Sequence, residues 1–109
     1  MLFEIKSVKS LKLRSGKELE VKVKILNRLG LHARPAALIA RVASRFAADI
    51  SLTPEGGSAV DAKSILSLLM LGAPCGSELT LAVNSSDAAV EAEAVQEISA
   101  LFAAKFDEE

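Results

Sequence analysis

With 109 residues, of which 50% are hydrophobic and 25% charged, the chain fits one globular domain and falls outside the disordered class. Its apolar stretches are too short to span a membrane, and its N-terminus lacks the continuous apolar segment of a secretory signal. The net charge is −1, and basic residues interleaved with aromatics are absent from the body of the sequence, which excludes a typical nucleic-acid-binding surface.

A basic segment precedes the regularly patterned part of the chain. Residues 1–17 contain five Lys or Arg and one acidic residue, so the remainder is acidic. Because this segment has no clear hydrophobic period, we predict an N-terminal extension over residues 1–17 and a single domain over residues 18–109. One alternative stays open, in which Leu2, Phe3, Ile5 and Val8 form an extra edge strand or contact a partner.

The first half of the predicted domain contains two strands and a helix. Apolar and charged residues alternate from residue 19 to 25, which predicts a strand with one buried face, and residues 27–30 form a connection. Residues 36–46 are rich in aliphatic side chains, with Arg41 and Arg45 on a separate face, which predicts a helix. Alternation returns over residues 48–53, where Ile50 and Leu52 should point inward.

The second half begins with a hairpin turn at residues 55–58 and a short strand over 59–62. A short helix follows, with Ser64 as its N-cap and Gly72 at its end. Residues 79–83 alternate again, and residues 88–106 form the last helix, with one apolar stripe (Val90, Ala94, Ile98, Leu101 and Phe102). The order βαββαβα, with one apolar face per strand, predicts an α+β fold with helices on a single side of one sheet.

His32 is the only histidine, and it stands directly before the first predicted helix. Pro35 suits the first turn of a helix and pushes Arg34 away from the α region, so the helix should begin between residues 33 and 35. A helix start offers unpaired N–H groups and partial positive charge to a phosphate, and a guanidinium can grip two phosphate oxygens. The positive end also disfavours imidazolium, and neutral imidazole is a nucleophile. We therefore predict that His32 accepts a phosphoryl group and that Arg34 binds it.

Residues 65–71 are apolar except for Ser67, and a two-turn helix cannot bury all of these side chains. Some of Ile65, Leu66, Leu69 and Met70 should therefore be exposed and form a docking surface. A fully buried strand is the competing interpretation, because short apolar runs fit both. Ser64 is a structural N-cap, and a phosphate there would add about two negative charges beside the apolar patch. The single cysteine, Cys75, is interpreted as a small apolar loop residue, and its lack of a disulfide partner fits a cytoplasmic protein.

Two stretches resemble one known family. The sequence NRLGLHARPAA, at residues 27–37, resembles the active-site signature of the HPr family, the histidine-containing phosphocarriers of the bacterial phosphoenolpyruvate-dependent sugar phosphotransferase system. The sequence DAKSILSLLMLGA, at residues 61–73, resembles the family's second signature, around a regulatory serine. The resemblance covers about residues 18–109. It implies an open-faced two-layer sandwich, in which a four-stranded antiparallel sheet of order 1-4-2-3 carries three helices on one face.

The resemblance also implies roles for individual residues. His32 would receive a phosphoryl group on Nδ1 from enzyme I and pass it to an enzyme IIA domain, with Arg34 binding phosphate. Ser64 would be the site of an ATP-dependent HPr kinase/phosphorylase, and regulatory proteins are further partners. The docking residues would be Ala36, Ile65, Leu66 and Leu69. The protein would be a phosphoryl carrier with a phosphohistidine intermediate rather than a free-standing enzyme, without cofactor or metal.

The downstream partner is left open by departures from the family pattern. The stretches ALFAAKFDEE and SLLMLGA look closer to the nitrogen-branch relative of HPr, which regulates rather than feeds sugar transport. A carrier in sugar uptake is the leading prediction, and a nitrogen-branch regulatory carrier is the alternative. A third hypothesis, from another class, is an interaction protein whose histidine has no chemical role.

Overall fold

The helices and strands follow one another in the predicted order, with one strand added before them. The computed structural model describes residues 12–14 and 18–108. The elements are β1 (Lys12–Arg14), β2 (Glu18–Lys24), α1 (Ala33–Ala43), β3 (Asp49–Pro54), β4 (Val60–Asp61), α2 (Ile65–Leu71), β5 (Glu78–Asn84), α3 (Ala88–Ala103) and a short 3₁₀ turn, η1 (Lys105–Asp107).

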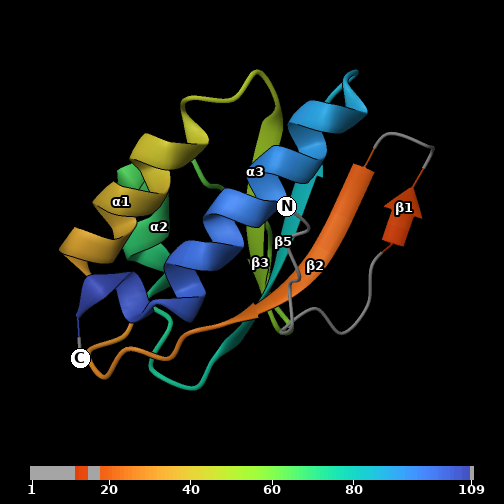
Figure 1. Ribbon diagram of the computed structural model, residues 1–109. Helices are drawn as coiled ribbons and strands as arrows, with labels where there is room; N and C mark the ends of the chain where they lie inside the picture. Colours follow the sequence, from red (N-terminus) through yellow and green to blue (C-terminus); the bar gives the residue numbers. More distant parts are fainter. Residues whose placement is uncertain (1–11, 15–17, 109) are drawn as a thin grey trace.

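The strands form one antiparallel sheet in the order β1-β2-β5-β3-β4 (Figure 1). The last four strands of this order confirm the predicted arrangement 1-4-2-3. The added strand β1 pairs with the beginning of β2, with Lys12 opposite Glu20 and Arg14 opposite Glu18. Residues 12–14 therefore extend the sheet, although the sequence pattern placed them outside it. The alternative edge strand involving Leu2, Phe3, Ile5 and Val8 lies outside the described residues.

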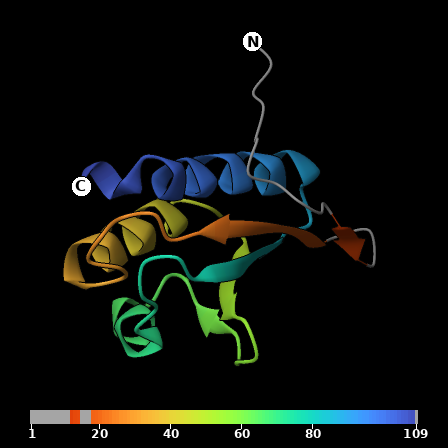
Figure 2. The same ribbon diagram turned by 90° about the horizontal axis from the view of Figure 1, so that it is seen from below.

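Helices α1, α2 and α3 lie on the same side of this sheet (Figures 1 and 2). The inward side chains of the strands are those predicted from the alternation, since Val21, Val23, Ile50 and Leu52 are at most 3% exposed. Helix α3 contributes the buried residues Ala94, Ile98 and Phe102 from its predicted stripe, whereas Val90 and Leu101 are only partly buried. One hydrophobic core between the sheet and the helices therefore holds the fold together.

Two of the three helices end earlier than the pattern predicted. Helix α1 stops at Ala43, and residues 44–46 continue as a hydrogen-bonded turn that buries Phe46. Helix α3 stops at Ala103 rather than near residue 106. Helix α2 has the predicted ends, and its helical form excludes the competing strand. Within residues 12–14 and 18–108, no helix is long and apolar enough to cross a membrane.

Candidate functional site

His32 occupies the N-cap of α1, as its position before Pro35 predicted. Its backbone is extended, with φ −122° and ψ −164°, and its side chain does not cap the helix. The first turn contains no acidic residue, so nothing within that turn offsets the positive end of the helix. Because the first N–H groups of a helix have no intrahelical acceptor, the amides of Ala33 and Arg34 are suited to bind an anion beside His32.

The segment before His32 is held by the loop that follows α2. The N–H of Leu31 donates to the carbonyl of Ala73 at 2.9 Å. Gly30 has φ +75°, and a Cβ on it would lie 2.7 Å from the same carbonyl oxygen. A glycine is needed here both for its left-handed backbone and for this close approach. The start of α1 is thereby tied to the end of α2.

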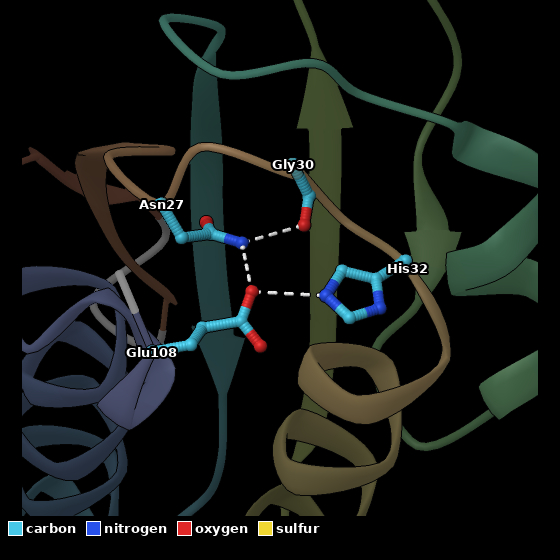
Figure 3. Close-up of polar contacts among 4 residues, drawn as sticks. All are labelled: Asn27, Gly30, His32 and Glu108. Carbon is cyan, nitrogen blue, oxygen red and sulfur yellow. Dashed lines mark hydrogen bonds and ion pairs between the residues drawn. The ribbon is translucent and has the colours of Figure 1, made fainter.

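The imidazole of His32 contacts the C-terminal segment of the chain. Its Nε2 lies 2.9 Å from Oε1 of Glu108, and Nδ1 is on the ring edge that faces away from this carboxylate (Figure 3). An ionised carboxylate only accepts hydrogen bonds, so the proton of a neutral imidazole is held on Nε2. The lone pair is then on Nδ1. The His32 side chain is 37% exposed, so part of the ring is accessible from solvent.

Asn27 holds Glu108 from the other side (Figure 3). Its Nδ2 donates to Oε1 of Glu108 at 2.9 Å and to the carbonyl of Gly30 at 2.7 Å. Asn27 is fully buried, so its amide is fixed by both bonds. The result is a chain of contacts from Gly30 through Asn27 and Glu108 to the imidazole of His32.

These contacts favour the ionised form of Glu108. Hydrogen bonds from His32 and then Asn27 lower the pKa of the Glu108 carboxyl from its usual value of 4.5, and the charges of His32 and Arg34 lower this pKa further. Burial opposes the shift. Glu108 is therefore a permanent hydrogen-bond acceptor for His32 near neutral pH.

Arg34 is an exposed residue in the first turn of α1, two positions after His32. A guanidinium there combines with the free amides of the same turn to form a cationic environment near the imidazole. The arrangement suits a dianionic phosphoryl group that is attached to His32 and then given up.

Ser64 is placed at the start of α2, where its Oγ accepts a hydrogen bond from the N–H of Ser67 at 3.1 Å. The structural role predicted for it is thus confirmed. The opposite end of α2 is the one tied to Leu31, so Ser64 and His32 are separated by the length of this helix, roughly 10 Å at 1.5 Å per residue.

The docking residues predicted on α2 are exposed, whereas the one predicted on α1 is buried. The exposed fractions are 45% for Ile65, 68% for Leu66 and 38% for Leu69. Ala36 is completely buried on the inner face of α1, so its side chain cannot touch a partner, and its predicted docking role is wrong. Three further large apolar side chains are exposed, Met70 on α2 and both Leu26 and Leu29 in the loop before His32.

Sequence reasoning missed Asn27 and Glu108 as parts of the site. Glu108 is 76 positions from His32, so no local spacing connects the two residues. The acidic end of the chain was the only available signal, and such ends are usually solvated. Among the residues that the structure describes, His, Cys, Asp and Glu form no cluster of three or more suited to a metal ion.

Comparisons with known proteins identify relatives of the chain. The family model described as "PTS HPr component phosphorylation site" matches residues 19–104. A phosphocarrier protein HPr from Treponema pallidum is 48% identical, over 80% of this chain and 94% of that protein. A phosphocarrier protein NPr from Shewanella violacea is 44% identical, over 84% of this chain and 96% of that protein. The crystal structure of HPr-C-His from Thermoanaerobacter tengcongensis has a TM-score of 0.74 and 39% identity, covering 83% of this chain and 97% of that one.

Proposed function

The chain belongs to the HPr family of phosphocarriers, and from this membership we propose that His32 receives a phosphoryl group from phosphorylated enzyme I and transfers it to an enzyme IIA domain in sugar uptake. The observation that carries the proposal is the contact between Nε2 of His32 and Glu108, because it leaves the Nδ1 lone pair free beside the start of α1. Enzyme I and enzyme IIA are cytoplasmic partners in this proposal.

The transfer step follows from this geometry. The Nδ1 lone pair of His32 attacks phosphorus, a nitrogen–phosphorus bond forms, and the bond from phosphorus to the donor atom of enzyme I breaks with its electron pair returning to the donor. The imidazole ring gains positive charge as the bond forms. Glu108 stabilises this charge through Nε2–H, while Arg34 and the amides of the first turn of α1 stabilise the phosphoryl oxygens. Transfer to enzyme IIA is the same step in reverse with a different acceptor.

A nitrogen-branch role is the second candidate, because relatives named NPr match as extensively as relatives named HPr. The NPr of Shewanella violacea covers 84% of this chain, and the HPr of Treponema pallidum covers 80%. The chemistry at His32 is the same in both cases. The two candidates differ in the enzyme IIA that accepts the phosphoryl group.

We further propose Ser64 as a regulatory phosphorylation site. Its Oγ lies at the start of α2, directly before the exposed Ile65 and Leu66. A phosphate would add about two negative charges at this edge of the docking surface and weaken apolar contacts with a partner. The separation of Ser64 from His32 makes this an effect on docking rather than on the imidazole itself.

The test of the carrier function is phosphorylation by purified enzyme I and phosphoenolpyruvate. The wild type should acquire one acid-labile, base-stable phosphate, and His32→Ala should acquire none while keeping its melting temperature. The phosphorylated protein is then offered to a sugar-type and a nitrogen-type enzyme IIA, and the faster acceptor identifies the branch. A base-stable phosphate on the His32→Ala protein, or an unphosphorylated wild type, would refute the carrier function.

A further inference from the structure

The turn that follows α3 has an unusual backbone. Lys105, Phe106 and Asp107 have φ values of 56°, 54° and 59°, so three successive residues other than glycine are left-handed. In this region Cβ approaches the following carbonyl oxygen, and ordinary residues enter it only singly. Two hydrogen bonds stabilise the turn, from Asp107 N–H to the carbonyl of Ala104 and from Glu108 N–H to that of Lys105, each 3.0 Å long. A continued helix would also give these residues local backbone hydrogen bonds. Contacts outside the turn must therefore favour the left-handed turn over the helix.

The side chain of Phe106 provides that contact. It is 1% exposed, and its ring meets the ring of Phe102 edge to face, with centroids 5.0 Å apart and planes inclined by 64°. Edge-to-face contact is a favoured geometry of aromatic pairs, and the buried ring area adds to it. Phe106 therefore anchors the left-handed turn in the core.

The residues after this anchor reach His32. The turn sends the chain from the end of α3 towards the start of α1, where Glu108 accepts hydrogen bonds from His32 and Asn27 (Figures 1 and 3). A straight continuation of α3 would advance by about 1.5 Å per residue along its own axis and carry Glu108 in another direction. The position of the carboxylate thus depends on the turn, and the turn depends on Phe106.

We propose that Phe106 is a positioning residue for phosphoryl transfer at His32, acting entirely through Glu108. The inference rests on the proposed carrier function and adds a residue that touches neither the phosphoryl group nor the imidazole. Without its anchor the left-handed turn relaxes, Glu108 leaves Nε2, and the positive charge that develops on the ring loses its partner.

A spectroscopic experiment tests the positioning without any enzyme. In the unphosphorylated wild type, the Nε2 proton of His32 should give a downfield NMR signal that exchanges slowly with water. Phe106→Ala and Glu108→Ala should both lose this signal. Val95→Ala is the matched control, because Val95 is a buried residue of α3 away from the turn. It should lower the melting temperature and keep the signal.

Two variants keep the test decisive if Phe106→Ala folds poorly. Phe106→Leu retains an apolar anchor and should restore the Nε2 signal in large part. Lys105→Gly removes the conformational strain at one left-handed position, so it should raise the melting temperature and keep the signal. Persistence of the Nε2 signal in Phe106→Ala, or its loss in Val95→Ala to the same degree, would overturn the proposal.

Transfer kinetics supply the second measurement. Single-turnover acceptance from phosphorylated enzyme I should slow by about three- to tenfold in both Phe106→Ala and Glu108→Ala, which is the range expected for one hydrogen bond. The double variant should be no slower than either single variant, since both changes remove the same contact. If the transfer rate of the double variant falls by the product of the two single-variant factors, Phe106 does not act through Glu108. If enzyme I does not phosphorylate the wild type, the carrier function is refuted. The positioning of Glu108 by Phe106 is not refuted by that result, because the Nε2 signal is measured independently of enzyme I.

Discussion

At the scale of single residues, the proposed mechanism assigns nucleophilic attack, anion binding and orientation of the ring to different side chains. Nδ1 of His32 has the lone pair, the first turn of α1 and Arg34 provide the cationic surroundings, and Glu108 with Asn27 fixes the ring. The His32 side chain is 37% exposed and Arg34 is exposed, so these groups leave His32 open to solvent. An open arrangement of this kind suits a carrier, which must present the same group to two partners in succession.

Arg34→Ala should slow transfer without changing stability. Arg34 is exposed, so its removal leaves the core intact, but a charge-assisted contact to phosphate is worth about 1.5–3 kcal/mol, or roughly ten- to hundredfold in rate if it strengthens in the transition state. Single-turnover transfer from phosphorylated enzyme I measures the loss. Arg28→Ala, which removes another exposed guanidinium from the loop before His32, is the control and should have the smaller effect. Equal rates for Arg34→Ala and wild type would exclude a phosphate-binding role.

The contact between Glu108 and His32 predicts a pH-dependent contribution to stability. The pKa of Glu108 is lowered on folding, so its carboxylate stabilises the native state fully above the usual value of 4.5 and loses this effect as pH falls through the lower folded pKa. The difference in unfolding free energy between wild type and Glu108→Gln should therefore be largest above 4.5 and shrink as the pH falls through the lowered pKa of Glu108. Urea denaturation at a series of pH values measures it. A difference that grows on acidification would mean that Glu108 has no favourable partner in the folded protein.

At the scale of elements, hydrophobic periodicity and helix-capping residues in the sequence predicted most of the fold. Long-range contacts account for the strand and the helix ends that these patterns missed. Strand β2 is recognisable because Val21 and Val23 alternate with charged residues, and α2 because Ser64 and Gly72 mark its two ends. The end of α3 was misjudged because Ala104 and Lys105 are good helix formers, whereas the left-handed turn that replaces the helix depends on tertiary contacts such as the burial of Phe106 against Phe102.

For the site too, the residues set by local sequence were predictable and the long-range contact was not. His32 and Arg34 follow from the start of one helix, and Pro35 indicates that start in the sequence. The hydrogen bond to Glu108 depends on where the end of α3 lies relative to the start of α1, which is a property of the packed helices. The three-residue strand β1 is too short for alternation to reveal, and it is defined only by its pairing with β2.

Helix α2 divides its side chains between core and surface, and this predicts opposite effects of two neighbouring leucines. Leu66 is 68% exposed, so Leu66→Ser should change the unfolding free energy by less than about 0.5 kcal/mol but weaken enzyme I binding about tenfold. Leu68 is fully buried, so Leu68→Ala should cost about 2–5 kcal/mol of stability and, where folded, retain affinity. Calorimetric titration of enzyme I and thermal melts give both values. If Leu66→Ser binds enzyme I with unaltered affinity, this face of α2 is not part of the interface. The same titration with Ser64-phosphorylated protein tests the proposal that Ser64 is a regulatory site.

At the scale of the whole molecule, the site and the added strand are at opposite sides. The start of α1 and the C-terminal segment meet at one side, and β1 is at the other in both views (Figures 1 and 2). The α1 start, the loop after α2 and the segment after α3 come together there through hydrogen bonds of Leu31 and His32. Changes at the β1 edge should therefore reach His32 only by weakening the sheet as a whole.

Deleting residues 1–17 tests this separation. Among residues 12–14 and 18–108, strand β1 pairs with Glu18–Glu20 alone, at the end of β2 opposite to Lys24 and the loop leading to His32. Removing it eliminates three cross-strand pairs and exposes one edge of β2, at a cost of about 1–2 kcal/mol. We expect a melting temperature lower by several degrees and an unchanged rate of transfer from phosphorylated enzyme I at a temperature where both proteins are folded. Thermal melts and single-turnover kinetics on the two proteins decide the matter. A slower rate in the folded truncated protein would show that the extension takes part in transfer, either by contacting enzyme I or by holding the loop before His32. Leu29→Ala in both backgrounds would separate these two causes, because Leu29 is the more exposed of the two exposed leucines in that loop, at 69% against 42% for Leu26.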